Sequence, residues 1–188
     1  MRLLCFGDSN TYGYDPRSFL GERYPAESRW TDLLARSTGW EVLNGGCNGR
    51  SIPAPVSAAQ LPQADGLIIM LGSNDLLQGC SAREISARME RFLMPLLPTY
   101  SHILLVAPPP MKQGAWVTEE RLLTESAMLT GAYEALARRL GIAFADAGLW
   151  GVELTFDGVH FSEAGHRVFA AGIRAALECR EVPPCSLG

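Results

Sequence analysis

The chain has 188 residues, of which 47% are hydrophobic and 19% are charged, a composition typical of a globular protein rather than a disordered one. This length suits a single domain with a sizeable core. The net charge of -4 and the isoelectric point near 5.4 give no electrostatic reason to expect a nucleic acid or an anionic membrane as partner. No segment has the length of a membrane span and the N-terminus lacks the pattern of a signal peptide, so we expect a cytoplasmic protein.

Short apolar runs alternate with amphipathic stretches along the whole chain. The apolar runs predict strands at residues 3–6, 42–43, 67–71, 103–107 and 142–144. The amphipathic stretches predict helices at residues 29–37, from 81 to about 97, at 118–140 and at 162–177. The third run lacks polar alternation, which is typical of a central strand covered on both faces. Strands that alternate with helices in this way predict parallel βαβ units.

Local signals mark the ends of some of these helices. Ser81 and Glu84 have the spacing of a capping box, so a helix is expected to begin there. Pro95 and Pro98 are expected to end the same helix. Gly141 occupies the position of a helix C-cap just before the last predicted strand.

Five strands joined by four crossovers predict a flavodoxin-like fold. We expect an α/β protein whose single domain has three layers (α/β/α) and a five-stranded parallel sheet in the order 2-1-3-4-5. The domain is predicted to span residues 1–178, followed by a C-terminal tail at 179–188. The five cysteines lack paired spacing and are expected to be reduced thiols, with a disulfide between Cys179 and Cys185 as the alternative.

The motif Gly7-Asp8-Ser9-Asn10 directly follows the first predicted strand. Ligands of open α/β sheets bind outside the carboxyl ends of the strands. A serine hydroxyl at this edge can attack a bound carbonyl if a base and an anion-stabilising pocket are also present. Ser9 is therefore a candidate nucleophile. Taken alone, the motif is better explained as a turn in which Asp8 or Ser9 caps the next helix.

His160 is the candidate base, because it lies in a predicted loop just before the last helix. The other two histidines are His102, which begins a strand, and His166, which lies inside a helix. Asp157 precedes His160 by three residues, so its carboxylate can fold back to Nδ1 and leave Nε2 free to accept a serine proton. Taken alone, Asp157 and Gly158 also suit a simple tight turn.

Two further loops at the same edge are candidates for stabilising an oxyanion. The loop after the second strand contains Gly45, Gly46 and Gly49, and glycine can turn main-chain N–H groups toward an anion. Asn74 follows the third strand and offers a side-chain amide. Each loop alone suits an ordinary turn with a helix cap. Because no structural need brings a serine, a glycine nest, an amide and an Asp–His pair to one edge, their coincidence favours an acyl-transfer site.

These four segments resemble the sequence blocks of the SGNH hydrolases, the family of GDSL-type esterases and lipases. The resemblance covers nearly the whole chain. It implies that Ser9 is the catalytic nucleophile and that Asp157 and His160 complete a triad. It also implies an oxyanion hole made by Ser9, Gly49 and Asn74, with Gly49 preferred because the functional glycine comes last in the family's second block.

Further segments resemble the aryl esterase and acyltransferase (perhydrolase) branch of this family, namely residues 5–9, 29–30, 68–72 and 106–110. In that branch the pocket is small and apolar, and acyl groups pass to alcohols or peroxide as well as to water. The chain departs from it at Asn10, where leucine is common, and in the loop 50–62, which looks shorter. The apolar composition and the resemblance also lead us to expect a homo-oligomer of unspecified size.

The motifs and the resemblance together predict a serine esterase with a small-molecule ester as substrate. We expect short-chain carboxylic esters of aryl or small alkyl alcohols, with acyl transfer as a side activity. No metal or cofactor is expected, because the acidic residues lack the His and Cys neighbours of a zinc site. The alternatives are a carbohydrate O-acetyl esterase and, from another class, a non-catalytic flavodoxin-like binding domain. Loop residues that are candidates to line the substrate pocket, or else simply belong to the core, are Tyr12, Ile52, Trp116, Val159 and Phe161.

Overall fold

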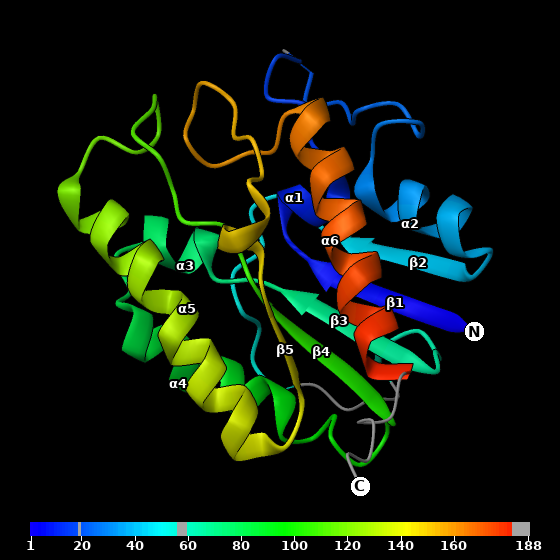
Figure 1. The fold of residues 1–188 in the computed structure, drawn as a ribbon. Coiled ribbons are helices and arrows are strands. Elements are labelled where there is room, and N and C mark those ends of the chain that lie inside the picture. The colour runs from blue at the N-terminus through cyan, green and yellow to red at the C-terminus, as the bar shows by residue number, and fades with distance from the viewer. Residues whose placement is uncertain (19, 56–59, 182–188) are drawn as a thin grey trace, which may run out of the picture.

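The computed structural model describes residues 1–18, 20–55 and 60–181. Five parallel strands form one sheet in the order β2-β1-β3-β4-β5, which confirms the predicted order (Figure 1). The fold is therefore a flavodoxin-like α/β sandwich. The strands are β1 (Arg2–Gly7), β2 (Glu41–Gly46), β3 (Gly66–Met70), β4 (His102–Ala107) and β5 (Ala143–Asp146).

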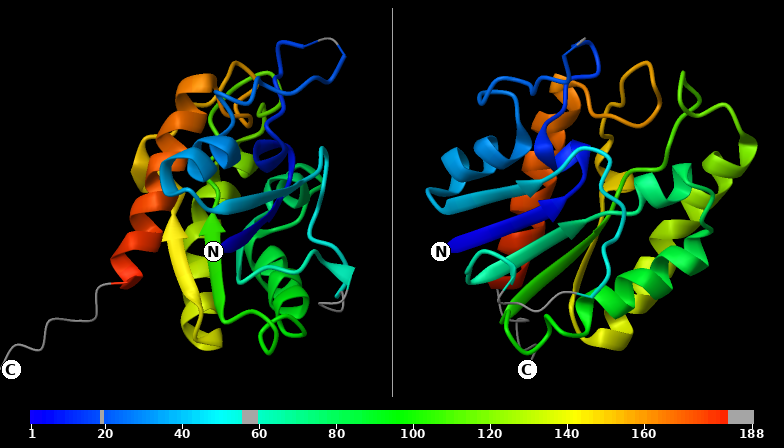
Figure 2. Two further views of the ribbon diagram at one scale, coloured as in Figure 1. Left: turned by 90° about the vertical axis from the view of Figure 1, so that its right-hand side faces the viewer. Right: turned by 180° about the vertical axis from the view of Figure 1, so that it is seen from behind.

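Helices cover both faces of the sheet (Figures 1 and 2). One face carries α2 (Trp30–Thr38) and α6 (Glu163–Glu181), and the other carries α4 (Ala82–Leu93) and α5 (Glu120–Leu140). Shorter helices follow the carboxyl ends of three strands: α1 (Ser9–Tyr12) after β1, α3 (Ser73–Leu77) after β3, and the 3₁₀ helix η2 (Ala147–Trp150) after β5.

Alternating strand residues divide the core into two layers. In β1, Leu4 and Phe6 belong to the layer beneath α4 and α5, whereas Leu3 and Cys5 belong to the layer beneath α2 and α6. The central strand β3 is fully buried along its length, as its unbroken apolar run predicts. Both faces at the centre of the sheet are thus removed from water, and the short helices that follow β1, β3 and β5 lie at its carboxyl edge.

Most predicted boundaries hold to within a few residues. The capping box is confirmed, because Ser81 Oγ accepts the Glu84 N–H and Glu84 accepts the Ser81 N–H. The helix that begins there ends at Leu93 rather than near residue 97, since Pro95 has no N–H to continue the ladder. β5 lies slightly later than predicted, because Asp146 still pairs with Ala107 of β4.

The C-terminal helix extends beyond its predicted end. α6 runs to Glu181, so the first residues assigned to a tail are helical. The remainder of that predicted tail, with Cys185 and hence the alternative disulfide, lies outside the described residues. Cys5, Cys47 and Cys80 are free thiols. No helix in the described part of the chain combines the length and the apolar character that a membrane crossing requires.

Two glycines allow α1 to pack directly onto the ends of the first two strands. A Cβ atom at Gly7 would collide with the side chain of Thr11, and one at Gly46 would collide with the main chain of Tyr12. A larger residue at either position would therefore displace α1. This close approach places Ser9 at the carboxyl edge of the sheet.

His166 is a buried histidine whose ring nitrogens have no hydrogen-bond partner among the described residues. Its ring lies against Tyr24 and Phe161 inside the molecule. Burial, with smaller contributions from the charges of His160 and Arg29, lowers the pKa of His166 from 6.5 to about 3. The folded protein therefore keeps this imidazole neutral.

This burial predicts an acid-sensitive fold. The unfolded chain binds the His166 proton at an ordinary pKa of 6.5, whereas the folded chain binds it only near pH 3, so the free energy of unfolding falls as pH decreases between these values. In urea unfolding, the wild type should have a lower free energy of unfolding at pH 4.5 than at pH 7.5. His166→Leu should make this difference smaller by about 2–3 kcal/mol. The matched control His102→Leu replaces an exposed histidine and should keep the pH dependence of the wild-type free energy of unfolding. The same pH dependence in His166→Leu as in the wild type would contradict the prediction.

Candidate active site

Ser9 is the first residue of α1 and lies immediately after Asp8, the residue that caps this helix. Asp8 Oδ1 accepts the N–H of Asn10 at 3.0 Å, so the capping role belongs to Asp8. Burial raises the pKa of Asp8 to about 6. The Ser9 hydroxyl is left to make a different contact.

Ser9, His160 and Asp157 form one continuous row of hydrogen bonds. Ser9 Oγ lies 2.9 Å from His160 Nε2, and His160 Nδ1 lies 2.6 Å from Asp157 Oδ2. All three residues are buried. The structure thus brings together the candidate nucleophile, the candidate base and the carboxylate expected to orient that base. Ser9 and His160 are nevertheless 151 residues apart in the chain.

The second oxygen of Asp157 is held by its own loop. Asp157 Oδ1 accepts the main-chain N–H groups of Val159 and His160, each at 2.9 Å, and the hydroxyl of Thr155 at 3.0 Å. Burial alone would raise the pKa of Asp157, but the hydrogen bonds from His160 and Val159 outweigh it and lower this pKa to about 2. The carboxylate is therefore ionised at neutral pH and accepts the Nδ1 proton of His160.

Aromatic rings from two other loops flank the imidazole of His160. The ring of Tyr14 lies 4.8 Å from it, and the ring of Trp116 lies 5.0 Å from it at nearly a right angle. Trp116 is about half exposed, with 50% of its surface open to solvent. The histidine ring is thus enclosed on its sides by aromatic surface.

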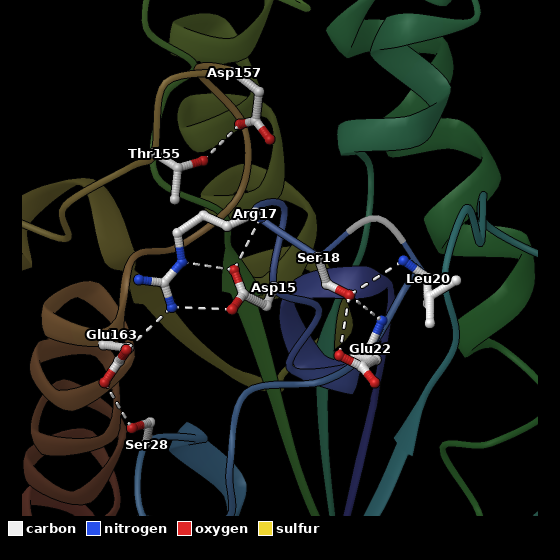
Figure 3. A network of polar contacts seen from close by, with 9 residues as sticks. All are labelled: Asp15, Arg17, Ser18, Leu20, Glu22, Ser28, Thr155, Asp157 and Glu163. Carbon is white, nitrogen blue, oxygen red and sulfur yellow. Dashed lines mark hydrogen bonds and ion pairs between the residues drawn. The ribbon is translucent and has the colours of Figure 1, made fainter.

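A polar network holds the loop that carries Tyr14 (Figure 3). Arg17 bonds Asp15 through two of its nitrogens, each at 2.9 Å, and reaches Glu163 in the first turn of α6 at 3.1 Å. Glu163 also accepts the hydroxyl of Ser28 at 3.0 Å. Arg17 is largely exposed, so each ion pair contributes little stability alone. Together they tie the loop to the start of α6.

Of the three glycines considered for an oxyanion site, only Gly49 lies outside β2. Gly45 and Gly46 are the last residues of that strand. Gly49 is exposed, has a φ of +70° and has open space around its Cα. It therefore has the left-handed conformation that favours glycine and a free approach from solvent.

Arg50 and Asn74 connect the Gly49 loop to the sheet. Arg50 donates to the main-chain oxygens of Gly7 and Gly45, and its guanidinium lies 4.3 Å from the ring centre of Phe6. The carbonyl of Arg50 accepts one N–H of the Asn74 amide at 3.1 Å. Asn74 has a second amide hydrogen, which this contact leaves available.

Asp75 supports the same loop from within. Its carboxylate is fully buried, accepts the N–H of Ile52 at 3.0 Å and pairs with Arg88 at 2.9 Å. The sequence did not single out Arg50 and Asp75 as site residues. Neither stands in a recognisable motif, because their partners lie 5 to 43 residues away and become neighbours only when the sheet forms.

The residues considered for a substrate pocket lie in different environments. Trp116 contacts His160 and is open to solvent. Ile52 and Val159 are buried in the core layer beneath α4 and α5. Phe161 is fully buried against Phe169 and His166 in the other layer, so its side chain packs in the core rather than at the site. Tyr12 is partly buried beneath the guanidinium of Arg23.

No cluster of three or more His, Cys, Asp or Glu side chains with the geometry of a metal site occurs within residues 1–18, 20–55 and 60–181. The polar groups that converge at the carboxyl edge are a hydroxyl, an imidazole, a carboxylate and amides. This set can activate a serine and donate hydrogen bonds to an anion, which are the requirements of acyl transfer.

Comparison with known proteins gives a consistent result. The chain is 27% identical to a carbohydrate acetylesterase from Sinorhizobium meliloti, with a TM-score of 0.81 over 96% of this chain and 100% of that one. It is 28% identical to the aryl esterase of M. smegmatis, with a TM-score of 0.77 over 97% and 99% of the two chains. A search of curated proteins gave no match.

A family model described as the GDSL-like lipase/acylhydrolase family matches residues 5–168. This range includes every residue of the hydrogen-bonded row, the Gly49 loop and Asn74. The chain therefore belongs to the GDSL-like lipase/acylhydrolase family, also known as the SGNH hydrolases, and is a carboxylic ester hydrolase.

Proposed function

We propose that this protein is a serine esterase that hydrolyses short-chain carboxylic esters of aryl or small alkyl alcohols. The observation that carries the proposal is the unbroken row of hydrogen bonds from Ser9 through His160 to Asp157. An imidazole held in this way accepts the serine proton on one nitrogen while the carboxylate stabilises its tautomer through the other. Family membership supports the same reading over a non-catalytic binding domain.

Acylation begins when Ser9 Oγ attacks the ester carbonyl and its proton passes to His160 Nε2. Asp157 then stabilises the imidazolium through its Nδ1–H. The tetrahedral intermediate collapses, the bond to the alcohol oxygen breaks, and His160 returns its proton to the departing alcohol. Water then attacks the acyl-enzyme with His160 as base, which releases the carboxylic acid and restores Ser9. An alcohol or peroxide in place of water would give acyl transfer, the proposed side activity.

The developing oxyanion needs donors on the side away from His160. The N–H groups of Ser9 and Gly49 and the second hydrogen of the Asn74 amide are the proposed donors. The proposal is supported by the positive φ of Gly49 and by the bond from Asn74 to the Arg50 carbonyl, which fixes the amide plane. Donors held in place before the reaction stabilise the charge without reorganising.

The proposed preference for aryl and small alkyl alcohols rests on the surface beside the base. Trp116 and Tyr14 lie against the ring of His160, which protonates the leaving alcohol, so an apolar alcohol group would bury its surface against these rings. The similarity to an aryl esterase supports this choice.

Replacement of the nucleophile tests the proposal directly. Ser9→Ala should reduce p-nitrophenyl acetate hydrolysis to near background, a loss of about 10³-fold or more in kcat. Ser86→Ala, which replaces a serine of α4 whose hydroxyl donates to the Ala132 carbonyl of α5, is the matched control and should keep wild-type rates. Circular dichroism verifies folding of both. A folded Ser9→Ala protein with wild-type activity would show that Ser9 is not the nucleophile.

The role of Asn74 makes a separate prediction. Asn74→Ala removes a donor that acts mainly in the transition state, so kcat should fall by about 10²–10³-fold while KM changes little. Steady-state kinetics with p-nitrophenyl acetate measures both constants. A near-native kcat in the folded variant contradicts the assignment.

A second candidate function is removal of acetyl groups from carbohydrates, favoured by the similarity to a carbohydrate acetylesterase. Comparison of kcat/KM for p-nitrophenyl acetate and for acetylated xylose separates the two. Because Trp116 lies against His160, we expect the higher kcat/KM for the aryl ester. Trp116→Ala should lower kcat/KM for the aryl ester more than kcat/KM for the sugar ester. A higher value for acetylated xylose would favour the carbohydrate esterase instead.

A further inference from the structure

Asn10 follows Ser9 in α1 and is almost completely buried, with 3% of its surface exposed. Its main chain is held at both ends: the N–H donates to Asp8 Oδ1 at 3.0 Å, and the carbonyl accepts the indole N–H of Trp30 at 3.1 Å. The backbone next to Ser9 is therefore fixed by partners from the strand end and from α2.

The side chain of Asn10 bonds the loop that carries His160. Its Nδ2 donates to the carbonyl of Val159 at 3.1 Å, and its Oδ1 accepts the N–H of Phe161 at 2.9 Å. These two residues lie immediately before and after His160. The amide thus makes the pair of bonds that the N–H and C=O of one residue in a neighbouring parallel strand would make.

These bonds couple Ser9 to His160 through the main chain. Within the described part of the chain, the hydrogen bonds between α1 and residues 155–161 are the two from the Asn10 side chain and the Ser9–His160 contact itself. Other bonds of that loop, from Asp157 and from Thr155 N–H to the His160 carbonyl, are internal to it. The main-chain N–H groups of Lys112, Ala115 and Trp116 also donate to carbonyls of residues 156–158. These bonds set the shape of the loop and hold it to residues 112–116, whereas the Asn10 side chain ties it to α1 beside Ser9.

We propose that Asn10 is a positioning residue that holds His160 in register with Ser9, which rests on the proposed roles of those two residues. The reaction needs His160 Nε2 at hydrogen-bond distance from Ser9 Oγ, and a displacement of about 1 Å can lower the rate by about 10²-fold. A short side chain with both a donor and an acceptor is required. Aspartate lacks the donor and leucine lacks both.

The deciding experiment replaces Asn10 by the similarly sized leucine, which removes both bonds while filling the same space. Asn10→Leu should lower kcat for p-nitrophenyl acetate by about 10–100-fold and leave KM within about twofold. Asn10→Ala is the second variant, in case leucine does not fit, and should give the same split between kcat and KM. Rates are measured well below the Tm of each variant, so that unfolded protein does not contribute.

Two control proteins distinguish a loss of kcat through lost positioning from a loss of kcat with another cause. Ile103→Ala opens a cavity at the amino end of β4, the edge of the sheet opposite to Ser9, and should lower Tm without lowering kcat. Ser9→Ala tests the proposed function in the same assay.

Each result decides the matter. If kcat is retained in both Asn10 variants while Ser9→Ala is inactive, the positioning role alone is overturned. The same conclusion follows if KM rises at constant kcat, or if Ile103→Ala loses as much kcat as the Asn10 variants. If Ser9→Ala stays fully active, the proposed function and the positioning role both fall. A selective loss of kcat in the Asn10 variants, with inactive Ser9→Ala and normal Ile103→Ala, establishes the role.

Discussion

The carboxylate of Asp157 accepts hydrogen bonds from the side chains of His160 and Thr155 and from the main-chain N–H groups of Val159 and His160. An ionised carboxylate in such a buried position would destabilise the fold if these donors were absent, because burial penalises an unpaired charge. The loop around it must therefore keep the one conformation that supplies all of them. That conformation also directs the His160 ring toward Ser9, so the geometry of the site follows from the need to satisfy one buried anion.

The remaining support comes from main-chain groups at the edge of the sheet. Arg50 binds the carbonyls at the ends of β1 and β2, and Asp75 binds a main-chain N–H of the same loop. Asn10 binds a carbonyl and an N–H on the other side of the site. Main-chain groups are present whatever side chain a residue carries, so these partners do not depend on the neighbouring side chains. Hydrogen bonds also restrict the direction of a contact more strongly than apolar packing does. The loops are thus rigid where the proposed chemistry needs them to be.

Much of the architecture could be predicted from the sequence, because strand runs, the capping box at Ser81 and the order of the sheet depend on local patterns and general topology. The Ser9, Asp157 and His160 motifs were recognisable because each lies in a turn next to a strand or helix end. The contributions of Asn10, Arg50 and Asp75 were not, since their partners lie between 5 and 151 residues away and no sequence spacing records them. For Phe161 the sequence left both a pocket and a core position open, and its side chain packs in the core, because an apolar residue next to a loop motif can point inward.

The Ser9–His160 and Asn10–Val159 bonds each join residues about 150 positions apart in sequence. Closing a loop of that size has an entropic cost that only the completed core offsets. During refolding, β1 and β3 can pair and bury their apolar faces while the last unit of the chain is still unattached. Esterase activity would then return only after α6 and the preceding loop have docked. A chain in which the loop around His160 has not docked against α1 lacks the Ser9–His160 bond, so the recovery of activity reports this docking and not the formation of the sheet alone.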